Sequence, residues 1–151
     1  MASPGAAASG GGWYTLSGSG RVNFGFTVRK ADSNCSSNCA YKGQLLLINT
    51  GKWRLKGNLT AYSKTSTGQS AASGTGDLYW WNASLKGGLG DWAPAKSGVS
   101  YTINFYDSGK SGKSSGDTFG IRIVYTPVAP QPSTLPNSTP QPLKGGDIKL
   151  S

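Results

Sequence analysis

The sequence predicts an all-β protein, an antiparallel β-sandwich of the immunoglobulin-like or jelly-roll-like type with six to eight strands. Three observations support this prediction. The 151 residues have the size of one domain and include 23 Gly, one Met and no Glu, so good helix formers are scarce. No window places apolar residues at helical spacing over three turns, whereas several segments alternate apolar and polar residues. Gly-rich turns separate these segments at intervals of about ten residues, as in sandwiches and barrels.

The candidate strands follow one another along most of the chain. Residues 1–12 have the composition of a flexible Gly/Ala/Ser linker. Residues 127–142 contain six prolines and cannot be a central strand, because Pro lacks the N–H that a ladder needs. We therefore expect a β-sandwich core at 13–126, a Pro-rich excursion at 127–142 and, at 143–151, a last strand of the same domain that closes a sheet edge. The strands expected within the core are 13–17, 20–30, 41–49, 52–63, 70–82, 99–107 and 117–125.

Four of these strands carry apolar residues at every second position. Because successive side chains of a strand point to opposite faces, such residues share one face and form the predicted core. They are Val22, Phe24, Phe26 and Val28; Trp53, Leu55, Leu59 and Ala61; Val99, Tyr101, Ile103 and Phe105; and Phe119, Ile121, Ile123 and Tyr125.

Basic residues are spread along the chain and do not cluster. The formal charge is +9, from 15 Lys and Arg against six Asp. Such a charge keeps a Glu-free β-protein soluble, and the basic, aromatic-studded pattern of nucleic-acid-binding domains is missing.

No apolar run approaches the roughly 18 residues of a membrane-spanning helix. The start lacks the features of a signal peptide, which indicates a piece cut from a longer exported protein.

Cys35 and Cys39 are the two cysteines, and the chain has no His. A structural zinc site takes four Cys or His ligands, which this chain does not offer. Redox pairs more often have two residues between the cysteines. We therefore expect a local disulfide. Disulfides persist in oxidising compartments, so an extracellular or cell-surface location is expected.

Six segments occur in an order that resembles a bacterial extracellular module, the post-choice-of-anchor domain. They are GSGRVNFGF, YKGQLLLIN, WRLKGN, SGTG, DSGKSGKSSGDTFGIRI and LKGGDIKL, and the resemblance covers about residues 18–151. It implies an all-β domain on secreted or surface proteins with no established catalytic activity. It also implies that the loop from Asp107 to Asp117 is the family's signature. The cysteine pair, the Pro-rich segment and the Trp content depart from the family pattern.

Catalysis is not expected from this composition. Without His, a Ser–His–Asp arrangement is impossible, and the six Asp are scattered. The aromatic residues Tyr79, Trp80, Trp81 and Trp92 offer sugar binding instead, because exposed flat rings can stack on sugar rings. Adjacent strand residues face opposite ways, so one of the two neighbouring Trp side chains faces outward or lies under a loop.

Asp107 and Asp117 bracket a loop of Ser, Gly and Lys. These two carboxylates and the serine carbonyls are candidate calcium ligands, since Ca²⁺ takes about six to eight oxygens. Lys110 and Lys113 would repel a cation, and no other cofactor is expected. In the alternative, each aspartate accepts hydrogen bonds from backbone N–H groups of the loop itself and holds the Gly-rich turn closed.

The function expected is that of a non-catalytic structural, anchoring or interaction domain of a bacterial secreted or cell-surface protein. Its partners would be other domains of the parent protein or neighbouring subunits. One alternative is a carbohydrate-binding module that holds a cell-wall or other glycan on exposed Trp and Tyr side chains. Another is a subunit of an extracellular fibre, in which a terminal strand such as 13–17 or 146–150 pairs with a neighbour.

Overall fold

The structure is a computed structural model that describes residues 6–17, 20–32, 34–35, 39–64, 69–108, 116–132 and 134–150. These ranges form ten strands and one short 3-10 helix, η1 (Lys86–Gly88). The strands are β1 (Ala6–Leu16), β2 (Gly20–Lys30), β3 (Tyr41–Asn49), β4 (Trp53–Asn58), β5 (Ala61–Lys64), β6 (Gln69–Asn82), β7 (Asp91–Tyr106), β8 (Thr118–Ile123), β9 (Ser138–Pro142) and β10 (Gly145–Leu150).

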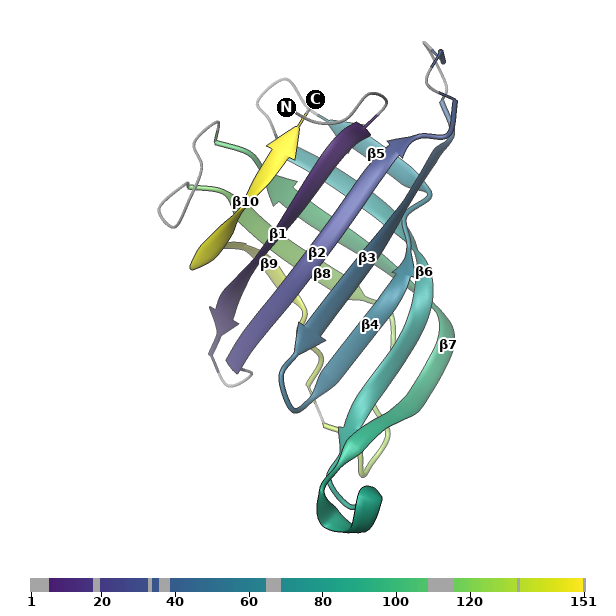
Figure 1. Ribbon diagram of the computed structural model, residues 1–151, viewed down its shortest axis with the longest axis vertical. Helices are drawn as coiled ribbons and strands as arrows, with labels where there is room; N and C mark the ends of the chain where they lie inside the picture. Colours follow the sequence, from purple (N-terminus) through teal and green to yellow (C-terminus); the bar gives the residue numbers. More distant parts are fainter. Residues whose placement is uncertain are drawn as a thin grey trace.

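All ten strands belong to one sheet, in which every pairing is antiparallel (Figure 1). The order is β10-β1-β2-β3-β4-β6-β7-β8-β9, and β5 pairs with β6 beyond the end of β4. The all-β antiparallel prediction is confirmed, but the described residues form ten strands where six to eight were expected, because 52–63 divides into β4 and β5 and the Pro-rich segment adds β9. The strands form one strongly curled sheet, a half-barrel, instead of the two separate sheets expected. The physical reason lies in β6 and β7, which continue for 14 and 16 residues and so carry the sheet around the bend without interruption.

The buried apolar residues of the longer strands point into the concave side of the curled sheet. The alternating residues of β2, β7 and β8 are buried as predicted, and so are Trp53, Leu55 and Leu59. Tyr125, also predicted for the core, lies beyond the end of β8 and is only partly buried. Ala61 is exposed, because β4 ends at Asn58 and pairing resumes only at the start of β5. In the centre, Phe24 of β2 stacks on Phe119 of β8 with ring centroids 3.9 Å apart. The strands β2 and β8, which lie on opposite sides of the half-barrel, therefore contact each other directly in the core.

Residues 6–12, expected as flexible linker, form the first part of β1. The small residues there are needed for close packing. A Cβ at Gly10 would lie 2.9 Å from the side chains of Phe26 and Ile148, and one at Gly12 would lie 2.2 Å from the carbonyl oxygen of Gly145. Strand glycines of this kind mark positions where another chain segment approaches closely. The linker-like composition thus belongs to a strand squeezed between β2 and β10.

The described part of the Pro-rich segment packs against the rest of the domain, and the segment ends in the edge strand β9. The indole N–H of the fully buried Trp53 donates to the carbonyl of Thr134 at 2.9 Å. The Asn137 side chain takes the place of a strand partner for Ile123: its carbonyl oxygen accepts from the Ile123 N–H at 2.8 Å, and its amide donates to the Ile123 carbonyl at 3.2 Å. The segment therefore covers the core where β8 ends.

Candidate functional site

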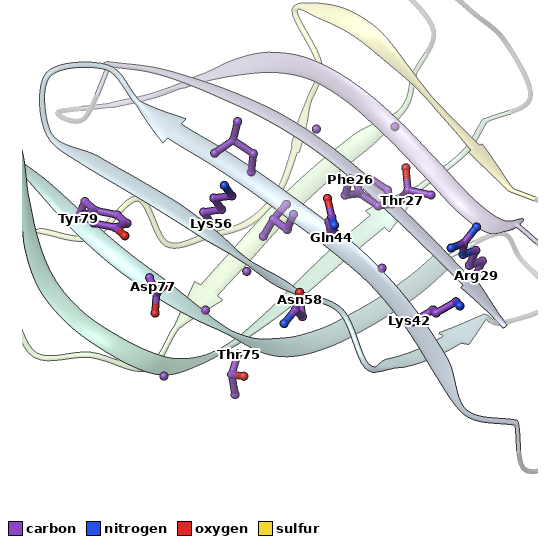
Figure 2. A pocket seen from close by; sticks show the side chains of 18 residues that line it. Phe26, Thr27, Arg29, Lys42, Gln44, Lys56, Asn58, Thr75, Asp77 and Tyr79 are labelled. Carbon is purple, nitrogen blue, oxygen red and sulfur yellow. The ribbon is translucent and has the colours of Figure 1, made fainter. Parts of the chain in front are cut away.

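A shallow, open hollow of about 1240 Å³ lies on the outer face of the sheet, across β2, β3, β4 and β6 (Figure 2). Most of its lining side chains alternate with the buried core residues of these strands, and the core residues Phe26 and Leu45 also line it. Because the core face is apolar, the alternate positions carry the polar groups. The polar lining residues are Thr27, Arg29, Lys42, Gln44, Lys56, Asn58, Thr75, Asp77 and Tyr79.

Strand register arranges these side chains in rows that cross the sheet. One row runs Thr27, Gln44, Asn58, and the next runs Gly25, Leu46, Lys56, Asp77. Arg29 and Lys42 form a cross-strand pair beyond the first row. Neighbouring strands lie about 4.8 Å apart, so a row of three or four residues presents closely spaced donors and acceptors. With the exception of the partly buried Tyr79, the polar lining residues are exposed.

Facing glycines set the bend of the sheet beside the hollow. Gly57 of β4 and Gly76 of β6 are cross-strand partners, and a Cβ on either would lie 2.6–2.8 Å from atoms of the other strand. This close approach leaves room for the Tyr101 hydroxyl, which donates a hydrogen bond to the carbonyl of Asn58. Burial raises the pKa of the Tyr101 hydroxyl, so the donor keeps its proton. A core tyrosine thus holds the backbone of Asn58 in the hollow.

The predicted aromatic residues gather beside the hollow, but not as a flat platform. The Arg54 guanidinium lies over the Tyr79 ring at 4.6 Å and 5.5 Å from the Trp92 ring centroid. Trp81 meets Trp92 edge-on, with an interplanar angle of 79°, and packs against Gly90 of the β6–β7 turn. Trp80 points the other way and packs against the core. Tyr79 is the member of this group that lines the hollow.

Asp107 and Asp117 bind the backbone of the last strand. The Asp117 carboxylate, 0% exposed, accepts hydrogen bonds from the N–H of Ile148 at 2.7 Å and from the N–H and hydroxyl of Ser108 at 2.8 and 3.0 Å. The Asp107 carboxylate accepts from the N–H of Leu150 at 3.2 Å. Lys110 and Lys113 lie outside the described residues. Asp117 therefore links the two ends of the loop through Ser108, and both aspartates occupy N–H groups of β10 that point away from β1.

A third carboxyl group lies next to this pair. Burial, and then the neighbouring Asp117 carboxylate, raise the pKa of Asp147 in β10. Within the described ranges, no three His, Cys, Asp or Glu side chains are grouped closely enough to hold a metal ion. The Asp117 contact with the Ser108 N–H is of the kind expected in the backbone-binding alternative, whereas the Asp107 contact is with the N–H of Leu150 in β10 and not with the loop.

Cys35 and Cys39 form the predicted disulfide, with their Cα atoms 5.7 Å apart. It closes a small loop between β2 and β3, next to the end of β2, where the ammonium of Lys30 donates to the Cys35 carbonyl at 3.0 Å.

In the described part of the chain, no helix is both long and apolar enough to cross a bilayer.

Comparison of the chain with protein-family models, with curated proteins and with solved structures gives no match. The resemblance to the post-choice-of-anchor domain thus remains a prediction. Gln44 was not singled out from the sequence, and neither was the grouping of Gln44, Asn58 and Lys56 in one hollow. Their outward positions follow from strand alternation, but their grouping depends on the register of β3 with β4, which the sequence pattern did not reveal.

Proposed function

We propose that this chain is a non-catalytic, extracellular binding domain that holds a carbohydrate in the hollow of its outer face. The observation that carries the proposal is the hollow itself, in which exposed amides, hydroxyls and charged groups converge from four adjacent strands. Binding sites are commonly concave, with a few well-placed polar groups that fix the ligand's orientation. The amides of Gln44 and Asn58, with the hydroxyl of Thr27, offer both donors and acceptors to sugar hydroxyls.

The proposal differs from a site built on stacked Trp rings. Trp81 and Trp92 pack against each other, Trp81 also packs against Gly90, and Arg54 lies 5.5 Å from the Trp92 ring centroid, so the two rings are partly used within the protein. Tyr79 supplies the aromatic contact of the hollow. The specificity of such a site would come mainly from hydrogen bonds, with one ring edge or face adding apolar contact.

An anchoring role on a secreted or surface protein fits the same proposal. The disulfide is typical of proteins that work in oxidising surroundings. A fibre built by strand pairing is the less favoured alternative, because the outward N–H groups of Ile148 and Leu150 are already bonded to aspartate carboxylates. An added strand would have to displace both carboxylates. In the proposed role, the domain attaches its parent protein to a glycan.

The test is a titration of the ¹⁵N-labelled protein with a panel of plant, bacterial and host oligosaccharides. We expect amide shifts to concentrate in β2, β3 and β4 around the hollow. Gln44→Ala combined with Asn58→Ala should weaken binding about tenfold or more, since each lost hydrogen bond is worth about 1 kcal/mol. Asn104→Ala, an exposed amide of β7 outside the hollow, is the matched control and should leave the affinity unchanged. Shifts that map to another face would contradict the proposal.

A further inference from the structure

The charges in the hollow are unbalanced. Arg29, Lys42 and Lys56 line it together with a single carboxylate, Asp77, among the described residues. Within those residues, no ion pair joins Arg29, Lys42 or Lys56 to a carboxylate. The hollow therefore presents net positive charge on a surface that is open to large ligands.

One pair of these cations opposes the stability of the fold. Arg29 and Lys42 are direct cross-strand partners on the same exposed face. Like charges placed opposite each other destabilise a sheet. The next row toward the hollow's centre begins with the neutral Thr27 and Gln44, so no neighbouring carboxylate relieves the repulsion there. An anion bound between the two side chains would relieve it.

We propose that the ligand of the hollow is an acidic polysaccharide, whose carboxylate or sulfate groups bind Arg29, Lys42 and Lys56 while its hydroxyl groups bind Gln44 and Asn58. This inference rests on the proposed function and names the class of its ligand. Arg29 and Lys42 form one anion-binding position and Lys56 the other. Figure 2 shows these side chains on adjacent strands of the same face.

The distance between the two anion-binding positions favours a polymer over a single sugar as the ligand. Lys56 is paired with Leu46, which is four residues along β3 from Lys42. With a rise of about 3.3 Å per residue and about 4.8 Å between strands, the backbone positions of Lys42 and Lys56 are about 14 Å apart. A monosaccharide reaches both positions only if the two long lysine side chains bend toward each other, which costs side-chain entropy. A chain with repeated acidic groups can engage both at once, and the second contact is then intramolecular.

The hollow is less suited to nucleic acid, the other common polyanion. Single strands are held by bases stacked on a series of open aromatic rings. Here Tyr79 is partly buried, and Arg54 already lies 4.6 Å from its centroid. The groups between the cations are amides and hydroxyls, which match sugar hydroxyl groups.

The experiment compares ligands that differ in charge alone. Oligogalacturonate and its methyl ester share one backbone, and dextran sulfate and dextran share another, so the two pairs separate carboxylate from sulfate recognition. We expect at least one acidic form to bind about tenfold or more tightly than its neutral partner in calorimetric titrations. Affinity should fall as NaCl rises from about 50 to about 300 mM, because exposed charges are screened. Free galacturonic acid should bind at least tenfold more weakly than the oligomer.

Two charge-matched variants locate the effect. Lys42→Gln with Lys56→Gln removes two charges from the hollow, whereas Arg122→Gln with Lys144→Gln removes two exposed charges elsewhere. The first variant should lose about tenfold in affinity for the acidic form, and the second should lose little. As a check of folding, the single substitution Lys42→Gln should give a melting temperature no lower than that of the parent protein, because it removes a repulsion between two positive charges.

The outcomes separate the inference from the function on which it rests. Equal binding of acidic and neutral forms in the hollow would overturn the inference and leave the proposed function standing. Tighter binding of an oligothymidylate than of either acidic glycan would also overturn the inference, in favour of nucleic acid. Absence of any glycan binding in the hollow would overturn both.

Discussion

Replacement of Asp117 by Ala should be among the most damaging single changes in this domain. The carboxylate is 0% exposed and lies at the junction of three segments, the end of β7, the start of β8 and the strand β10. Its truncation leaves the N–H groups of Ser108 and Ile148 without their acceptor. The Ser108 hydroxyl can rotate to another acceptor, whereas the two backbone donors are fixed in place.

The magnitude follows from these two donors. The Ile148 donor is buried, whereas the Ser108 donor is part-buried. A buried donor left without an acceptor costs about 1–3 kcal/mol and a part-buried donor costs less, so the two together cost about 2–5 kcal/mol. Loss of the repulsion between Asp117 and Asp147 offsets part of this cost. We therefore expect the free energy of unfolding to fall by about 2–4 kcal/mol. With a urea m-value of about 2 kcal/mol/M, the unfolding midpoint would fall by about 1–2 M.

The assay is urea unfolding followed by Trp fluorescence, with Asp107→Ala as the matched control. The Asp107 carboxylate is partly exposed and accepts from the Leu150 N–H at 3.2 Å, so its loss should cost about 0.5–1.5 kcal/mol. Hydrogen exchange of the Ile148 amide should also accelerate in Asp117→Ala. A loss below about 1 kcal/mol for Asp117→Ala, or a larger loss for Asp107→Ala, would refute the reasoning.

Two further predictions concern stability. Asp147 has a raised pKa in the folded state, so its contribution to stability is present at low pH and is lost as pH rises through that pKa. Asp147→Asn should therefore raise the melting temperature at pH 7 and have little effect below about pH 3, where the carboxyl is largely protonated in both states; equal effects at both pH values would count against this. Gly74→Ala should cost about 2 kcal/mol or more, because its Cβ would lie 1.8 Å from the Asn58 carbonyl oxygen, whereas Gly25→Ala, with nothing within 4 Å, should change stability by less than about 1 kcal/mol in urea unfolding.

The fold class and much of the core could be predicted because β-strands show their burial in a two-residue period. Phe24, Ile103 and Ile121 occupy the apolar positions of such patterns, and all three are buried. The first half of β1 could not be recognised, because Gly and Ala at 6–12 leave no apolar period. The single curled sheet was also missed. It depends on how far β6 and β7 continue through the bulges between Gly76 and Tyr79, and periodicity does not report the length of a ladder.

Only a small part of the candidate site could be predicted from the sequence. Tyr79 was singled out as an aromatic residue, and the structure places it in the hollow. Lys42, Gln44 and Asn58 are ordinary outward residues in the sequence, and they become a site only through the register of adjacent strands. A local motif cannot show this, because the residues come from separate strands.

The pairing of β1 with β10 decides how the domain responds to mechanical force. Ala8 lies opposite Leu150 at one end of this pair, and Trp13 lies opposite Gly145 at the other. A pull on the two chain ends therefore acts across the ladder and breaks its bonds one after another, since the bonds lie perpendicular to the strands. The ladder unzips and does not shear. As β10 separates from the sheet, the hydrogen bond from Leu150 to Asp107 breaks first and the buried hydrogen bond from Ile148 to Asp117 breaks next. The two aspartates therefore resist the separation of β10 one after the other.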